Sequence, residues 1–144
     1  MISDVWYKSD RDDWETPSDL FKQLNEEFHF TLDLCASETN HKVSKYYTKE
    51  NDGLLADLSG ERVFCNPPYG RYETIKWVKK CAESGTLCVM LLPARTDTAF
   101  FHDYIYEKAE IRFIRGRLHF ELGGKPMDRA PFPSMIVIFR GNNG

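Results

Sequence analysis

The longest apolar run of the chain, Leu87 to Pro93, limits the choice of folds more than any other segment. A membrane-spanning helix needs roughly 20 apolar residues, so this run is far too short to cross a bilayer. It also lacks the polar and apolar alternation of a strand that has one face in water. Continuous apolar strands are typical of parallel sheets that helices cover on both faces. The sequence therefore predicts a buried parallel strand over Thr86 to Leu92.

Predicted helices and strands alternate on both sides of this strand. Thr16-Pro17 suits a helix start, because threonine is a good N-cap and proline fits the first helical turn. An apolar stripe continues that helix to about Phe28, and similar stripes predict helices over Tyr72 to Ser84 and Thr98 to Lys108. The other predicted strands are Phe28 to Leu34, Glu61 to Cys65, Ala109 to Ile114 and Ser134 to Arg140.

This order predicts a single α/β domain over residues 1–144. Strand, helix and strand in succession imply right-handed crossovers and a mostly parallel sheet. No helix pattern separates the last two strands, so we expect them to form an antiparallel hairpin at one edge. A loop over residues 116–133, rich in glycine and proline, joins them, and residues 1–12 are expected to form a loose polar arm.

Composition and charge exclude several classes of protein. The chain has 144 residues, of which 42% are hydrophobic and 28% charged, as in ordinary globular proteins. Its first residues lack the features of a signal peptide, so we expect a cytoplasmic protein. The net charge of −3 argues against a protein that coats nucleic acid by charge alone, although it permits a local basic face. The four cysteines form no Cys-x-x-Cys pair, so we expect reduced structural thiols and no zinc.

Three candidate site segments come where an apolar strand gives way to a loop. They are Asp33 to Ala36, Asn66 to Tyr69, and Leu92 to Arg95. Ligands of open parallel sheets bind outside the carboxyl ends of the strands. We therefore expect these three segments to meet in one site.

The segment Asn66-Pro67-Pro68-Tyr69 can orient an amine. Its prolines fix two φ angles and keep Asn66 out of the helical region, so the loop is rigid and extended. The amide oxygen of Asn66 and the carbonyl of Pro67 can both accept protons from one –NH₂ group, which aims the nitrogen lone pair at an electrophile. Tyr69 offers a flat face on which a base can stack, worth roughly 1–3 kcal/mol. The alternative is a plain diproline turn with a buried tyrosine.

The tetrapeptide matches the catalytic motif of amino methyltransferases, whose fold is a seven-stranded sheet with an antiparallel edge strand. More closely, the chain resembles the small phage-type DNA N6-adenine methyltransferases. The resemblance runs from about Asp13 to Phe139. It rests on Trp14 to Pro17, Phe30 to Ala36, Val63 to Gly70, Leu91 to Thr98 and Phe113 to Phe120.

The resemblance implies a Rossmann-like methyltransferase fold and S-adenosyl-L-methionine as the cofactor. Besides Asn66, it implies that the cofactor site includes Thr16, Pro17, Asp33, Cys35 and Ala36. The implied catalytic residues are Asn66, Pro67, Pro68 and Tyr69. The chain departs from the usual pattern because Leu34 to Ser37, the turn after the first strand, contains no glycine. The acid that grips the cofactor ribose stays open among Glu38, Glu50, Asp52 and Asp57.

The same resemblance makes DNA the partner and the N6 amine of adenine the methyl acceptor. A base inside a duplex cannot reach such a pocket, so a flipped adenine is implied. We expect Arg71, Arg95 and Arg117 to contact the substrate. Other basic residues near strand ends or in the long loop are Lys76, Lys79, Lys80, Arg115, Lys125 and Arg129. With little room for a separate recognition domain, either the loop over residues 116–133 reads the target, a homodimer supplies more surface, or specificity is low.

Several alternatives stay open at this stage. The same motif serves methylation of cytosine N4, of an RNA base or of a protein glutamine. A non-catalytic protein that binds nucleic acid could also keep this fold. Cys65 lies next to Asn66, but its position in an apolar strand favours a structural role over nucleophilic attack.

Overall fold

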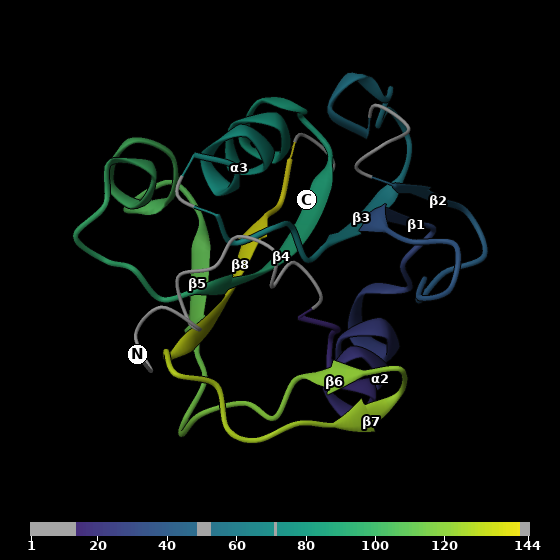
Figure 1. Cartoon of the computed structure of the whole chain (residues 1–144). Helices are drawn as coiled ribbons and strands as arrows, with labels where there is room; N and C mark the ends of the chain where they lie inside the picture. Colours follow the sequence, from purple (N-terminus) through teal and green to yellow (C-terminus); the bar gives the residue numbers. More distant parts are fainter. Residues whose placement is uncertain (1–13, 49–52, 71, 142–144) are drawn as a thin grey trace.

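The computed structural model describes residues 14–48, 53–70 and 72–141, which form a three-layer α/β structure (Figure 1). The central sheet has six strands in the order β2-β1-β3-β4-β8-β5. Their bounds are β1 Leu32–Ala36, β2 Tyr46–Thr48, β3 Arg62–Cys65, β4 Leu87–Pro93, β5 Glu110–Phe113 and β8 Ser134–Phe139. Two α-helices, α2 (Ser18–Phe28) and α3 (Thr74–Glu83), accompany the sheet. Within these residues, no helix has the length and apolar character needed to span a membrane.

The sheet is mostly parallel, as the sequence predicts. Strands β2, β1, β3 and β4 run parallel to one another, whereas β8 is antiparallel to both β4 and β5. The predicted antiparallel pair at one edge is confirmed. The resemblance implied seven strands, and the described residues place six in this sheet.

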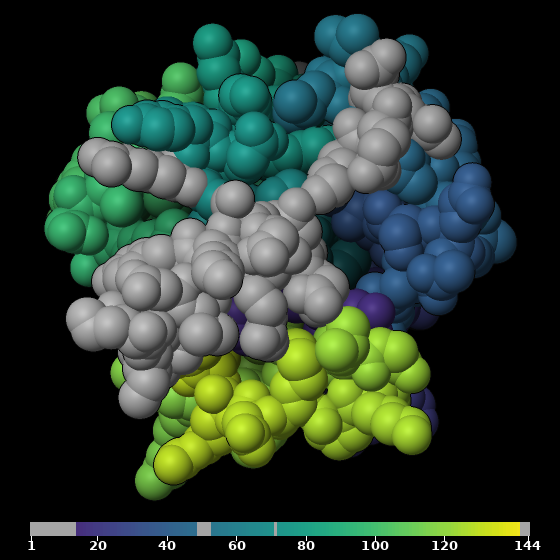
Figure 2. Space-filling view, viewed as in Figure 1, coloured from purple at the N-terminus to yellow at the C-terminus, as the bar shows by residue number. Residues whose placement is uncertain are grey.

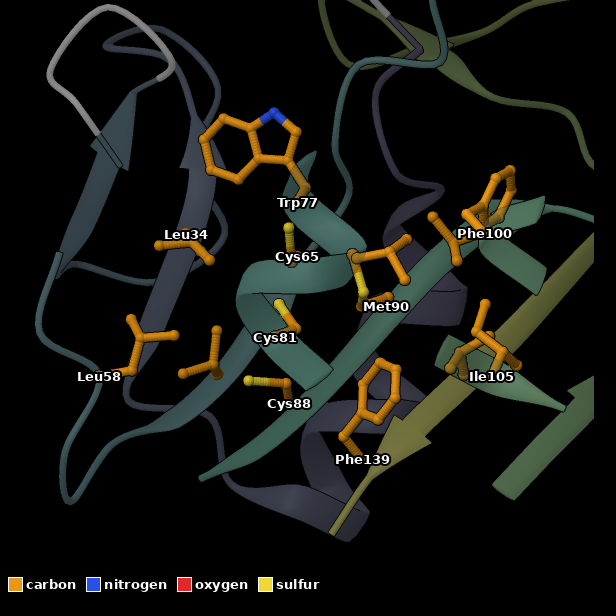
Figure 3. Close-up of a cluster of buried hydrophobic side chains, with 14 of the residues drawn as sticks. Leu34, Leu58, Cys65, Trp77, Cys81, Cys88, Met90, Phe100, Ile105 and Phe139 are labelled. Carbon is orange, nitrogen blue, oxygen red and sulfur yellow. The ribbon is translucent and has the colours of Figure 1, made fainter. Parts of the chain in front are cut away.

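Alternate residues of β4 enter two separate cores. Cys88, Met90 and Leu92 join a cluster with α3, and Figure 3 shows several of its members. Val89 and Leu91 face the opposite side, where α2 and the loop over residues 116–133 complete a second cluster rich in aromatic rings. Because both faces of β4 are covered, the strand has no solvent face and its sequence has no polar alternation.

Local contacts move some element boundaries away from the predicted ones. His29 adopts a left-handed conformation with a φ of 52°, and its N–H bonds to the carbonyl of Asn25, which ends α2 at Phe28. The side chain of Asn25 also accepts from the N–H of Phe30 at 2.8 Å. The strand predicted from Phe28 therefore starts only at Leu32.

Two predicted segments hold different structure. The helix expected over residues 98–108 is shorter, over residues 99–105, and it ends in the π-helical turn η2 (Phe101–Ile105), where the N–H of Tyr106 bonds back to the carbonyl of Phe101. The segment between the predicted strands Phe28 to Leu34 and Glu61 to Cys65 contains a further strand, the edge strand β2, and the short 3₁₀ turn η1 (Gly53–Leu55) follows it. Tyrosine and threonine favour strands, but three residues are too few to predict one, so the pairing of β2 with β1 is what makes it a strand.

The loop over residues 116–133 contains a small hairpin of its own. Strands β6 (Glu121–Leu122) and β7 (Lys125–Pro126) are joined by Gly123 and Gly124, both with positive φ. Figure 1 places this hairpin beside α2, and in Figure 2 the loop forms the lower edge of the molecule in light green to yellow. Pairing between Glu15 and Glu121 joins the hairpin to the segment before α2.

Candidate active site

The carboxyl ends of β1, β3 and β4 lie at the same edge of the sheet because these strands are parallel neighbours. The motif from Asn66 follows β3 directly, and Arg95 follows β4. Asp33 lies one residue inside β1, in register with Phe64, so it comes before the end of its strand. The three predicted segments are therefore brought to one edge, as expected.

The side-chain amide of Asn66 is held by three hydrogen bonds. Its Nδ2 donates to the carbonyl of Trp14 at 2.7 Å and to Oγ1 of Thr16 at 3.0 Å. Its Oδ1 accepts from the hydroxyl of Tyr69 at 2.5 Å. A backbone carbonyl can only accept, so the nitrogen must face Trp14 and the oxygen must face Tyr69. Oδ1 retains a second lone pair, with which it can accept a proton from a further donor.

The Tyr69 ring lies inside the protein, with 6% of the residue exposed. Two rings from the 116–133 loop contact it edge-on: Phe120 at 6.1 Å and Phe132 at 5.7 Å between centroids. Burial raises the pKa of the Tyr69 phenol well above its usual value, so the hydroxyl stays a proton donor. Because so little of the ring is exposed, a base can stack on it only after a neighbouring side chain moves.

The hydroxyl of Tyr69 has two acceptors for its single proton. Besides Asn66 Oδ1, the carbonyl of Leu91 lies 3.0 Å away. A rotation of the O–H bond can therefore transfer the hydrogen bond from Asn66 to Leu91. Such a rotation frees Asn66 Oδ1 for a different donor without leaving the phenol unpaired.

The backbone of the motif is fixed by side chains from other elements. Thr74, at the start of α3, donates from Oγ1 to the carbonyl of Pro68 at 2.9 Å. Arg95 donates from Nη1 to the carbonyl of Tyr69 at 3.2 Å. Sequence reasoning expected Arg95 to contact substrate, and its observed partner is the motif itself. The carbonyl of Pro67 remains the second candidate acceptor for an amine.

Asp33 is a buried carboxylate with 4% of the residue exposed. It accepts from the backbone N–H of Lys42 at 2.9 Å, and the N–H of Cys35 also faces it. Desolvation outweighs these hydrogen bonds and raises the pKa of Asp33 to about 6. A carboxylate with a shifted pKa at the ligand-binding edge of the sheet is a candidate functional group.

The ring of Trp77, on α3, lies close to Gly53, which also lies close to Leu34 of β1. A Cβ on Gly53 would come within 3.0 Å of its ring and within 2.9 Å of the Leu34 carbonyl, so Gly53 permits this close approach. The indole nitrogen is buried and has no hydrogen-bond partner among the described residues. Figure 3 shows this nitrogen pointing away from the cysteines below it.

The remaining predicted cofactor residues lie around the same edge. Cys35 and Ala36 end β1 and are half-buried, and Thr16 is buried where it meets Asn66. Pro17 precedes the first residue of α2. Of the four candidate ribose acids, Glu38 and Asp57 are exposed, and Glu50 and Asp52 lie outside the described residues.

A contact that sequence reasoning missed lies just before α2. We call residues 14–18 the strap. The strap supplies both acceptors for Asn66 Nδ2, and Glu121 of β6 holds its far end by accepting from the N–H and the hydroxyl of Ser18 at 2.8 and 2.9 Å. Glu121 and Ser18 are 103 residues apart, and no local pattern links them.

Basic residues gather on the loop over residues 116–133. A groove of about 710 Å³ is lined by Arg117, His119, Asp128, Arg129, Ala130 and Pro131. Arg117 also donates to the carbonyl of Ala130 at 3.4 Å, which joins the two arms of the loop. Of the other predicted basic residues, Lys76 pairs with Glu73 and Lys80 donates to the carbonyl of Ala56, whereas Arg71 lies outside the described residues.

The buried cysteines are structural. Cys65, Cys81 and Cys88 lie in a row between α3 and the sheet, each fully buried (Figure 3). Burial raises the pKa of Cys65 to about 11, so its thiol stays protonated and is a poor nucleophile. No group of three or more histidine, cysteine, aspartate or glutamate side chains in the described part of the chain could hold a metal ion.

A mostly parallel sheet with Asn-Pro-Pro-Tyr at its carboxyl edge defines an α/β protein of the amino-methyltransferase class. A family model described as DNA N-6-adenine-methyltransferase (Dam) matches residues 4–143. The chain belongs to this family, as its motifs predicted. A Haemophilus phage HP1 (strain HP1c1) protein named DNA N-6-adenine-methyltransferase is 33% identical over 141 residues, covering 92% of this chain and 80% of the relative. An Escherichia phage T1 protein of the same name is 33% identical over 125 residues, covering 83% of this chain and 52% of the relative.

Proposed function

We propose that this protein transfers a methyl group from S-adenosyl-L-methionine to the N6 amine of adenine in DNA. The observation that carries the proposal is the fixed orientation of Asn66. Its nitrogen is held by two acceptors, so its oxygen is presented with a free lone pair at the edge of the sheet where ligands bind. Membership of the DNA N-6-adenine-methyltransferase family supports adenine as the base.

The residues around the end of β1 fit the proposed cofactor. S-adenosyl-L-methionine carries an ammonium group, a sulfonium group and hydrogen-bonding atoms of its ribose and adenine. Asp33 supplies a buried acceptor suited to positive charge, and the indole N–H of Trp77, which has no partner among the described residues, supplies a donor. We propose that Asp33, Cys35, Ala36, Thr16 and Pro17 hold the cofactor. When bound, it would supply an electrophilic methyl group.

Asn66 and Pro67 act on the acceptor amine. Asn66 Oδ1 and the Pro67 carbonyl accept from the two N–H bonds of the adenine amine, which turns its lone pair out of conjugation with the ring. Positive charge develops on this nitrogen during transfer, and both oxygens stabilise it. The amine can use the free lone pair of Asn66 Oδ1, and if the Tyr69 hydroxyl turns to the Leu91 carbonyl, both lone pairs become available without leaving the phenol unpaired. The Tyr69 ring stacks on the flipped base once a neighbouring ring from the loop has moved.

The groove on the 116–133 loop is the proposed contact to the DNA backbone. Arg117 and Arg129 line it, and a guanidinium group can bind phosphate through two parallel hydrogen bonds. The protein has a net charge of −3, so its attraction to DNA must come from such local positive surface. We propose Arg71 and Arg95 as further substrate contacts.

Incubation with unmodified DNA and labelled cofactor, followed by mass spectrometry of the nucleosides, tests this function. We expect labelled N6-methyladenine. N4-methylcytosine would redirect the substrate assignment, and no product with DNA would contradict the proposal. Calorimetry with the cofactor alone separates a catalyst from a non-catalytic DNA-binding protein. A non-catalytic protein is expected not to bind S-adenosyl-L-methionine.

A further inference from the structure

The strap and the hairpin on the 116–133 loop are held together by a dense set of hydrogen bonds. The backbone groups of Glu15 and Glu121 bond to each other in both directions, at 3.2 and 2.9 Å. The carboxylate of Glu15 accepts from the N–H of Gly124 at 3.3 Å. The two oxygens of the Glu121 carboxylate accept from the N–H and the hydroxyl of Ser18.

Glu121 caps helix α2 from a distant part of the sequence. The N-cap position is Pro17, which has no side chain that can accept from the first helical N–H groups. The Glu121 carboxylate accepts from the first of them, the N–H of Ser18, and its negative charge suits the positive end of the helix. With 9% of the residue exposed, the carboxylate is shielded from water that could replace these contacts.

The same strap determines where the Asn66 amide points. Both Nδ2 protons of Asn66 are donated to strap atoms, Trp14 O and Thr16 Oγ1. An aromatic cluster runs along the same path: Trp14 contacts Phe120 and Phe132 at 5.4 and 5.3 Å, and both of those rings contact Tyr69. A movement of the hairpin therefore reaches the catalytic amide through both hydrogen bonds and packing.

We propose that Glu121 is a positioning residue that couples the 116–133 loop to the orientation of Asn66. The inference rests on the proposed function, since it concerns the rate of methyl transfer. The loop carries the arginine-lined groove, so DNA bound there sets the position of the hairpin, the hairpin sets the strap, and the strap aims Asn66. Methyl transfer is therefore fast only when DNA is bound to the 116–133 loop.

Three variants test the coupling: Glu121→Ala, Glu121→Gln and the control Glu27→Ala. Glu27 is an exposed acid at the other end of α2, paired with Arg112. We expect Glu121→Ala to lower kcat by roughly 10- to 100-fold, the scale of a small misplacement of reacting groups, with less than a threefold change in KM for DNA. Glu121→Gln keeps an oxygen for the Ser18 N–H and gains an amide for its hydroxyl, so it restores kcat. The control retains wild-type kcat.

The side-chain amide resonances of Asn66 give a readout independent of activity. They are assigned by their loss in Asn66→Ala, and we expect them to shift in Glu121→Ala and not in Glu27→Ala. A wild-type kcat in Glu121→Ala, or unmoved Asn66 resonances, would overturn the coupling. If a thermal melt shows that Glu121→Ala does not fold, Ser18→Ala is used instead, because it removes only the hydrogen bond from the Ser18 hydroxyl to Glu121 Oε1. The kcat and the Asn66 amide resonances of that variant then test the coupling. An inactive wild-type protein contradicts the proposed function instead, and the resonances still test the contact.

Discussion

Replacing Asp33 with asparagine tests whether the buried carboxylate lowers the stability of the folded protein. Desolvation raises its pKa from 3.8 to about 6 on folding. Between these values the folded protein holds a proton that the unfolded chain has released. Stability follows the protons bound by the unfolded state minus those bound by the folded state, so it falls as pH rises through this window. The loss is complete above the folded pKa.

The magnitude follows from the size of the shift. The pKa rises by about two units. Each unit corresponds to about 1.4 kcal/mol, so ionised Asp33 lowers the free energy of unfolding by roughly 3 kcal/mol at pH 7. For a chain of this length, that is roughly 10 °C in Tm. Asparagine cannot ionise, yet it keeps an oxygen that can accept from the N–H of Lys42.

Thermal melts followed by circular dichroism, from about pH 4 to pH 7 without cofactor, measure this effect. We expect the difference in Tm between Asp33→Asn and the wild type to move by roughly 10 °C in favour of the variant as pH rises. Asp57→Asn is a matched control, because hydrogen bonds from Ser59 lower the pKa of the exposed Asp57. Its stabilising effect is present at high pH and lost as pH falls, so the Asp57→Asn difference runs in the opposite direction. A Tm difference for Asp33→Asn that does not change with pH would refute the reasoning.

The remaining predictions concern catalysis, DNA binding and an unpaired hydroxyl. Asn66→Ala should stay folded and bind cofactor in calorimetry while transfer falls by roughly 100-fold or more, because it removes an acceptor aimed at the reacting amine; unchanged activity would remove Asn66 from the mechanism. Arg117→Ala should weaken DNA binding for all sequences and reduce the slope of log K against log salt by about one, as titrations at several salt concentrations will show; an unchanged slope places Arg117 away from phosphate. Ser134→Ala should keep or raise Tm, because the Ser134 hydroxyl is buried without a partner among the described residues; a clear loss of Tm would reveal a hydrogen bond to that hydroxyl.

The residue pattern was enough to predict the strands whose apolar sequence matches their burial in the folded sheet. The apolar run in β4 is buried on both faces, and the strands on either side of the motif were predicted to within two residues at each end. The start of β1 was misplaced because His29 adopts a left-handed conformation, which depends on the Asn25 contacts that end α2. Strand β2 was missed because only its pairing with β1 makes it a strand.

The sequence by itself determined the chemistry available to this protein. Two prolines after a strand make a rigid loop, and an asparagine before them offers an acceptor for an amine, whatever surrounds them. The tertiary structure alone decided how that asparagine is aimed. Its partners lie on the strap, about fifty residues earlier in the chain, and the strap is in turn held by Glu121 more than a hundred residues after it. Side-chain hydrogen bonds between segments so far apart leave no periodic or local pattern, because only the folded sheet brings their atoms within reach.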